Sequence, residues 1–141
     1  MPLPEKRWIQ RFDNYSKVLA YLEDFVALKE ARPLSVAEEF AILKAFELVF
    51  ECAWNVLKDL LQERGHSKIY GSRAAIRLAF RVGLIEDGAI WFDMVNKRNN
   101  TANAYDEETA HNVSYVVSSE YMKEFRCLKA NLEAMRNMEE K

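Results

Sequence analysis

The chain has 141 residues, of which 50% are hydrophobic, and it carries a formal charge of −2. This length and hydrophobic content fit one domain with a buried core, which we expect to cover residues 1–141. A chain without a basic excess is not expected to bind nucleic acid tightly on its own, although a local basic patch is allowed. Only four Gly and three Pro leave little material for the turns of a β-sandwich or a β-barrel.

No targeting or membrane signal is visible in the sequence. The first residues lack the apolar run and the small-residue cleavage site of a signal peptide. No stretch approaches the roughly 18 uncharged apolar residues of a membrane span, so we expect a cytoplasmic protein. Cys52 and Cys127 lie within helical patterns with no second cysteine close by, which predicts buried free thiols rather than a disulfide or a zinc site. We expect no metal and no cofactor.

Apolar residues at steps of three and four predict two long helices in the first half of the chain. The first helix covers about residues 5–29, and Pro33 marks its exit. The second starts at Ser35, which forms a capping box with Glu38, and it stops at Gly65. Two such helices suit a long antiparallel hairpin. The residues expected on their inner faces are Trp8, Phe12, Tyr15, Leu19, Leu22, Phe25, Phe40, Leu43, Phe46, Phe50, Ala53, Trp54, Leu57 and Leu61.

Three more helices are predicted in the second half. A short helix follows Ser72, a fourth begins around Asp87, and a fifth runs from Asp106 to about Asn137. No strand-like alternation competes with this pattern, which favours an all-α fold: an up-and-down four-helix bundle with an additional short helix. The expected inner residues are Ile76, Ala79, Phe80, Ile90, Trp91, Met94, Val95, Val113, Val116, Val117, Phe125, Leu128, Leu132 and Met135.

Residues 98–105, Arg-Asn-Asn-Thr-Ala-Asn-Ala-Tyr, place an arginine on an apolar helix face and follow it with amides. The residues three, four and seven places before the arginine are Val95, Met94 and Trp91, so all four side chains project to one side of a helix. An arginine in such a stripe must find a partner or extend its head group to water. Because asparagines are weak helix formers, we expect this stretch at a junction between two helices.

Two other groups of polar residues have both a functional and a structural interpretation. Arg73, Arg77 and Arg81 are spaced so that one edge of the third helix carries three guanidinium groups. Their planar forks of donors suit phosphates, whereas the simpler interpretation is a solvated face beside the apolar stripe. His66 and His111 lack the spacing of a metal-binding motif, which favours ordinary surface or hydrogen-bonded histidines.

A DNA-binding helix-turn-helix is a further interpretation of the turn from Arg81 to Asp87, because two short helices meet there. The start of the second helix argues against it. Glu86 and Asp87 would face the DNA phosphates, and Trp91 and Phe92 are typical of packing rather than of base recognition.

Three stretches carry a family resemblance: residues 72–88, Ser-Arg-Ala-Ala-Ile-Arg-Leu-Ala-Phe-Arg-Val-Gly-Leu-Ile-Glu-Asp-Gly, residues 91–95, Trp-Phe-Asp-Met-Val, and residues 98–110, Arg-Asn-Asn-Thr-Ala-Asn-Ala-Tyr-Asp-Glu-Glu-Thr-Ala. They resemble the HEPN family, in particular its branch of nucleotidyltransferase substrate-binding proteins. The resemblance implies a bundle of four or five helices, usually a homodimer. It also implies a gene beside that of a small nucleotidyltransferase, with the pair forming a toxin–antitoxin module.

The resemblance also assigns roles to residues 98–105. Active HEPN members are metal-independent ribonucleases whose motif is an arginine, four to six residues and then a histidine, often followed two places later by a tyrosine. Matched by position, the arginine is Arg98, the next polar residue is Asn99, and the tyrosine is Tyr105, to which the family's partner enzyme can attach AMP. The histidine position is Asn103. Because an amide cannot titrate, this change is expected to remove about 10²- to 10⁴-fold of the cleavage rate.

Two functions follow from these observations. The first is a HEPN-type subunit that binds the nucleotidyltransferase and a nucleotide or RNA phosphate, with weak or no nuclease activity. The second is an active ribonuclease toxin, inhibited by its partner, in which Asn103 or His111 replaces the missing histidine. On an uninterrupted helix Arg98 and Asn103 would point about 140° apart. They therefore converge only if the helix breaks between them or if a dimer axis completes the site.

Overall fold

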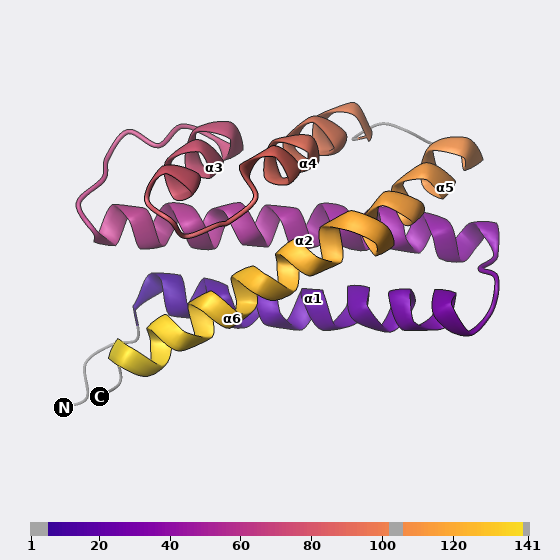
Figure 1. The fold of residues 1–141 in the computed structure, drawn as a ribbon, viewed down its shortest axis with the longest axis horizontal. Coiled ribbons are helices and arrows are strands. Elements are labelled where there is room, and N and C mark those ends of the chain that lie inside the picture. Colours follow the sequence, from indigo (N-terminus) through magenta and orange to yellow (C-terminus); the bar gives the residue numbers. More distant parts are fainter. Residues whose placement is uncertain (1–5, 102–105, 140–141) are drawn as a thin grey trace.

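The structure is a computed structural model that describes residues 6–101 and 106–139. Its base is an antiparallel pair of long helices, α1 (Arg7–Ala31) and α2 (Val36–Glu63), which lie side by side (Figure 1). Ser35 begins α2 by accepting the backbone N–H of Glu38 at 3.1 Å, while the Glu38 carboxylate accepts the N–H of Ser35 at 2.8 Å. This reciprocal pair confirms the predicted capping box.

A second layer lies along α2 on the side away from α1 (Figure 1). It consists of the short helix α3 (Ser72–Arg81) and of α4 (Gly88–Thr101). The start of α4 lies close to α3: a Cβ at Gly88 would stand 3.0 Å from the ring of Phe80. Glycine at this position therefore lets the two helices pack together.

The chain ends in one long helical run that crosses α2 and α1 diagonally (Figure 1). The run consists of α5 (Glu107–Val116), a π-helical turn η1 (Val117–Tyr121) and α6 (Met122–Glu139). Asp106 begins it by accepting the N–H of Thr109 at 3.0 Å, as the sequence predicted. Counted as one helix, this run brings the described residues to five helices without a strand, which confirms the predicted fold class.

Side-chain hydroxyls tie the diagonal run to the other layers. The Tyr15 hydroxyl of α1 donates to the backbone oxygen of Phe125 at 2.6 Å. On the other side, the hydroxyl of Tyr121 in η1 donates to the carboxylate of Asp93 on α4. Burial raises the pKa of Tyr121, and the Asp93 carboxylate raises it further, so the phenol keeps its proton and acts as a donor. The π turn is therefore fixed to the helix that carries Arg98.

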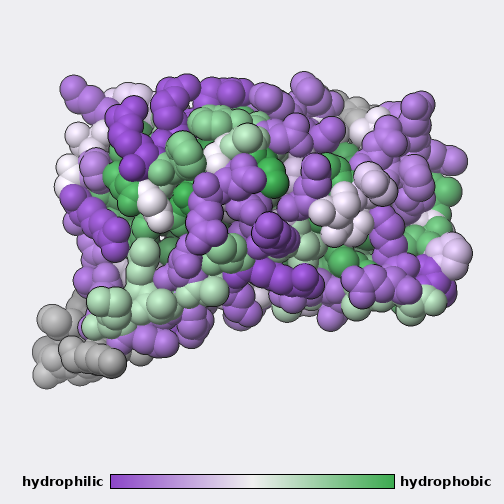
Figure 2. All heavy atoms as spheres, viewed as in Figure 1, coloured by the Kyte–Doolittle hydropathy of each residue, from purple (hydrophilic) through white to green (hydrophobic). Residues whose placement is uncertain are grey.

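Aromatic side chains from four segments fill the core. Phe46 stacks on Tyr121 with ring centroids 5.4 Å apart, and Trp91 meets Phe125 edge to face at 5.7 Å. The outside is mostly hydrophilic on the face that Figure 2 shows, with separate hydrophobic areas between the polar residues. No helix among the described residues is long and apolar enough to cross a membrane.

Most of the predicted inner residues are buried, and the exceptions have simple causes. Phe80 is 49% exposed, because α3 is only ten residues long and its core side is filled by Ala75, Ile76 and Ala79. Those expected inside that are only partly buried, although they pack against the core, are Phe25, Phe40, Trp54, Ile90, Val116 and Met135.

Candidate functional site

Arg98 lies in the last turn of α4, on the same face as three buried apolar residues of that helix. Its side chain is 26% exposed, and its Nε lies 3.4 Å from Oε1 of Glu51 on α2. The other carboxylate oxygen of Glu51 accepts the indole N–H of Trp54 at 2.9 Å, which holds the carboxylate in place. The arginine on the apolar face has thus found the partner that its position required.

The Arg98–Glu51 contact leaves the arginine incompletely satisfied. Nε of Arg98 is buried and makes no hydrogen bond with any described residue, because the contact with Glu51 is an ion pair without hydrogen-bond alignment. A partly exposed ion pair of this kind contributes only about 0–1 kcal/mol. Because Nε is buried, an anion would approach the exposed part of the side chain, where it can compete with this weak ion pair for the guanidinium.

A small cavity of about 100 Å³ opens beside Glu51, between α1 and α2. It is far smaller than the roughly 300–1,000 Å³ of a pocket that encloses a drug-sized ligand, so it has no room for a whole nucleotide. Burial raises the pKa of the Cys52 thiol in its wall, which disfavours the reactive thiolate. The cavity is lined by Arg11, Asn14, Glu51, Cys52 and Asn55.

The motif residues beyond Arg98 are only partly described. Asn99 is exposed in the last turn of α4, which continues to Thr101. Asn103 and Tyr105 lie outside the described residues, and the chain is described again from Asp106, the cap of α5. Residues 98–101 belong to α4 and Asp106 caps α5, so a new helix starts at Asp106, as the sequence predicted. The convergence of Arg98 and Asn103 stays a prediction.

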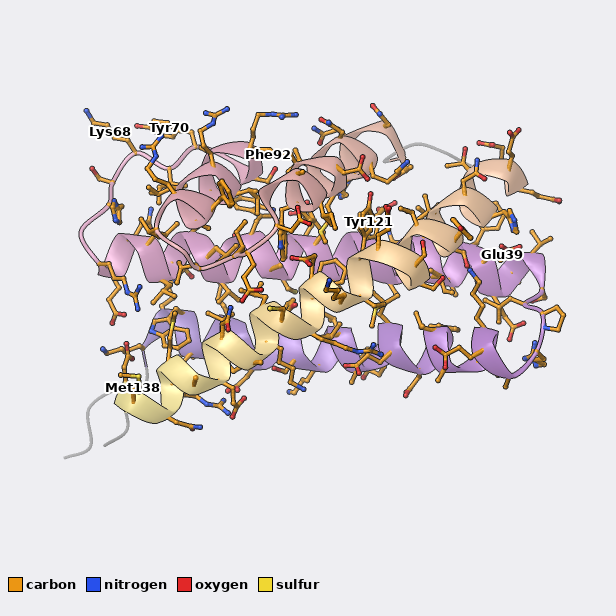
Figure 3. The ribbon with its side chains drawn as sticks, viewed as in Figure 1. Glu39, Lys68, Tyr70, Phe92, Tyr121 and Met138 are labelled. Carbon is orange, nitrogen blue, oxygen red and sulfur yellow. The ribbon has the colours of Figure 1, made fainter. Side chains whose placement is uncertain are left out.

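His111 lies on α5, and its Nδ1 is 2.7 Å from Oε2 of Glu39 on α2. Figure 3 shows Glu39 near the end of α2 that adjoins the α1–α2 turn. Arg98 meets the same helix at Glu51, twelve residues further on, which corresponds to about 18 Å along the helix axis. Within one chain, His111 is therefore poorly placed to act with Arg98.

The three arginines of α3 are all exposed. Nη2 of Arg73 donates to the side-chain oxygen of Asn96 on α4 at 2.8 Å, which joins the edges of the two helices. Arg77 and Arg81 make no ion pair with any carboxylate of the described residues. Their role as a phosphate-binding stripe stays a prediction.

The fold and the site together define an all-α bundle that presents an arginine at a helix junction. The chain belongs to the family described as nucleotidyltransferase substrate binding protein like, whose model matches residues 10–134.

Relatives and solved structures agree with this assignment. A 72-residue stretch is 33% identical to the probable ribonuclease HepT of Haemophilus influenzae, and it covers 48% of this chain and about half (49%) of that protein. A solved structure from Haemophilus influenzae, described as revealing the fold of a substrate binding domain of a nucleotidyltransferase, superposes with a TM-score of 0.75 at 25% identity. A crystal structure of a Thermus thermophilus protein superposes with a TM-score of 0.72 at 27% identity. Both structural matches cover 86% of this chain and 98% of the other.

Proposed function

We propose that this chain is the helical subunit of a two-component module. It binds a small nucleotidyltransferase encoded nearby and a phosphate of a nucleotide or RNA, and it has weak or no nuclease activity. The observation that carries the proposal is the partly buried Arg98, whose Nε has no hydrogen-bond acceptor among the described residues. Family membership and the description of the Haemophilus structure support the nucleotidyltransferase as partner.

The proposed phosphate contact follows from the chemistry of the guanidinium group. A phosphate offers several acceptor oxygens, so it can take two parallel N–H donors from one arginine. Without a ligand, the carboxylate of Glu51 lies beside Nε of this guanidinium group. Binding then exchanges a loosely aligned carboxylate for a better aligned phosphate oxygen, and Glu51 keeps its bond from Trp54.

Weak catalysis follows from residue 103. Metal-free cleavage of RNA requires a group that removes the proton of the attacking 2′-hydroxyl or supplies one to the leaving oxygen. Asn103 can do neither, although its amide can donate a hydrogen bond to a phosphate. Arg98 can still stabilise negative charge, so binding is retained while proton transfer is lost.

The proposal includes a homodimer, and one face of the molecule suits this role. Asn14 and Asn55 line the same cavity, and Tyr21 and Leu48 lie seven residues away from them on α1 and α2, so all four occupy one face. Tyr21 is 64% and Leu48 is 50% exposed. A twofold axis through this face would bring two copies of the neighbouring Arg98 towards one interface. Light scattering tests this: Leu48→Glu should give a monomer, while Met138→Glu on α6 should not.

The decisive experiment mixes the chain with the neighbouring nucleotidyltransferase and ATP, followed by gel filtration and mass spectrometry of the chain. A stable complex, with AMP on Tyr105, is the expected result. A chain that neither binds this enzyme nor carries AMP would contradict the proposal.

The second candidate function is an active metal-independent ribonuclease toxin that the partner inhibits by attaching AMP to Tyr105. The name of the relative HepT and the presence of Arg98 favour it. Purified chain incubated with RNA in EDTA distinguishes the two candidates. Robust cleavage that Arg98→Ala abolishes would establish the ribonuclease and overturn the binding subunit.

A further inference from the structure

Positive charge gathers in the segment that contains α3. From Arg64 to Ile85 the chain has five Lys and Arg residues and no Asp or Glu, although its overall formal charge is −2. Among the described residues, no carboxylate forms an ion pair with any basic residue of this segment. The basic groups of this segment are therefore free of direct carboxylate contacts within the described part of the chain and can meet a negatively charged ligand.

The arginines of this segment form a regular row. Arg73, Arg77 and Arg81 follow one another at four-residue steps, so they are spaced by about 6 Å along α3 and span about 12 Å. Like charges at this spacing repel each other and destabilise a helix. A chain of negative charges laid along the row would relieve this repulsion and be attracted by each arginine in turn.

An aromatic ring stands at the start of the row. Tyr70 is 80% exposed, the most exposed of the large hydrophobic side chains among the described residues. Figure 3 shows Lys68 and Tyr70 pointing outward from the loop before α3. Two neighbours of this ring hold the loop in a bent conformation, because Lys68 and Gly71 have φ angles of 62° and 91°. The ring is thus presented to solvent by the backbone and takes no part in the core.

We propose that this α3 surface, formed by Lys68, Tyr70, Arg73, Arg77 and Arg81, binds single-stranded nucleic acid. The arginines contact successive phosphates, and Tyr70 stacks on an unpaired base, which every base allows because each has a π face. A duplex hides its base faces, whereas a single strand offers both phosphates for the arginines and open base faces for the ring. The site goes beyond the proposed function, because it uses no residue of the stretch from Arg98 to Tyr105.

The expected affinity is modest and sensitive to salt. For single strands, each neutralised phosphate contributes about 0.7 to the slope of log affinity against log salt, so Lys68 and the three arginines predict a slope of about −3. This weak contact agrees with a chain whose overall charge is negative.

Fluorescence anisotropy with labelled ten-residue oligouridylate and oligothymidylate tests the proposal between about 50 and 200 mM salt. Tyr70→Ala should weaken binding about tenfold, while Tyr70→Phe retains the ring and the affinity. The double variant Arg77→Ala/Arg81→Ala should weaken binding and bring the salt slope to about −1.4. Tyr115→Ala and Arg126→Ala are matched controls on α5 and α6, where the exposed ring and guanidinium should not matter.

Two results would overturn the proposal: no binding of either oligonucleotide at the lowest salt concentration, or binding that the Tyr70 and arginine variants leave unchanged. Loss of the nucleotidyltransferase complex in these variants, without oligonucleotide binding by the native chain, would assign the surface to the protein partner instead. Arg98→Ala in the same assay should bind the oligonucleotides normally. The failure of this proposal is thereby distinguished from a failure at Arg98, and thermal melting checks that each variant is folded.

Discussion

Arginine is used in two different ways in this molecule. Arg98 is mostly buried on an apolar stripe and is held by Glu51, whereas Arg77 and Arg81 on α3 are exposed and have no carboxylate partner among the described residues. A side chain whose stem is packed on an apolar stripe loses little freedom when a ligand arrives, so it can fix the position of one phosphate. The exposed arginines must be ordered by the ligand and act mainly through charge. Arg98 is therefore suited to position one phosphate, whereas Arg77 and Arg81 are suited to attract a negatively charged ligand.

The largest expected effect comes from restoring the missing histidine. Asn103→His should raise metal-free RNA cleavage by about 10²-fold or more, because it returns a group that can transfer a proton. In that background Arg98→Ala should abolish the gain, whereas Arg77→Ala/Arg81→Ala should raise KM and leave kcat unchanged. Gel analysis of cleavage products measures both constants. An Asn103→His chain that remains inactive would mean that more than the histidine is missing.

Conservative replacement should separate the two kinds of arginine. Arg98→Lys should weaken the binding of AMP about tenfold in calorimetry, since an ammonium cannot reproduce a planar pair of donors. Arg77→Lys keeps the charge and should change oligonucleotide affinity by less than about twofold. Equal sensitivity at the two positions would remove the distinction between a positioned and an attracting arginine.

Removing Arg98 should also cost more stability than removing Arg77. Arg98→Ala removes the contact with Glu51 and the packing of the side-chain stem, and we expect a loss of about 1 kcal/mol, or about 2–4 °C in Tm. Arg77→Ala relieves repulsion along α3 and should leave Tm unchanged or slightly raised. Differential scanning calorimetry checks both values. A larger loss at Arg77 would show that the exposed row has a structural role.

The smallest predicted effect is the pH dependence of stability caused by Glu124 on α6, which lies near Asp87 at the start of α4. Burial raises the pKa of Glu124, and the nearby Asp87 adds to the rise, while the segment around α3 has no carboxylate at all. Folding therefore favours the protonated form of Glu124, and this group lowers the free energy of unfolding as pH rises above about 4.5. We compare the change in Tm caused by Glu124→Gln at neutral pH with the change at a pH below 4.5. The change at neutral pH should be more favourable by about 1–2 °C. An equal effect at both pH values would contradict this.

Local signals allowed much of the fold to be predicted from sequence. The Ser35 capping box, the Asp106 cap and the apolar stripe ending at Arg98 each act within a few residues, so they can be read without knowing what packs against them. Tyr121 was not predicted inside, although it lies four residues from both Val117 and Phe125, and its acceptor Asp93 comes from another helix. Glu51 was not predicted as the partner of Arg98 for the same reason, since it lies on a helix 47 positions earlier in the chain.

Because of the π turn at Val117–Tyr121, the number of residues between α5 and α6 determines which faces the two helices present to the core. A π turn holds one residue more than an α turn, and each residue of a regular helix rotates the next by about 100°. Removing one residue would let α5 and α6 join as a regular helix, but the faces they present would no longer match the core. Tyr121 would then turn away from Asp93, and α4 would lose this anchor. A deletion far from Arg98 in sequence can thus displace the helix that carries it.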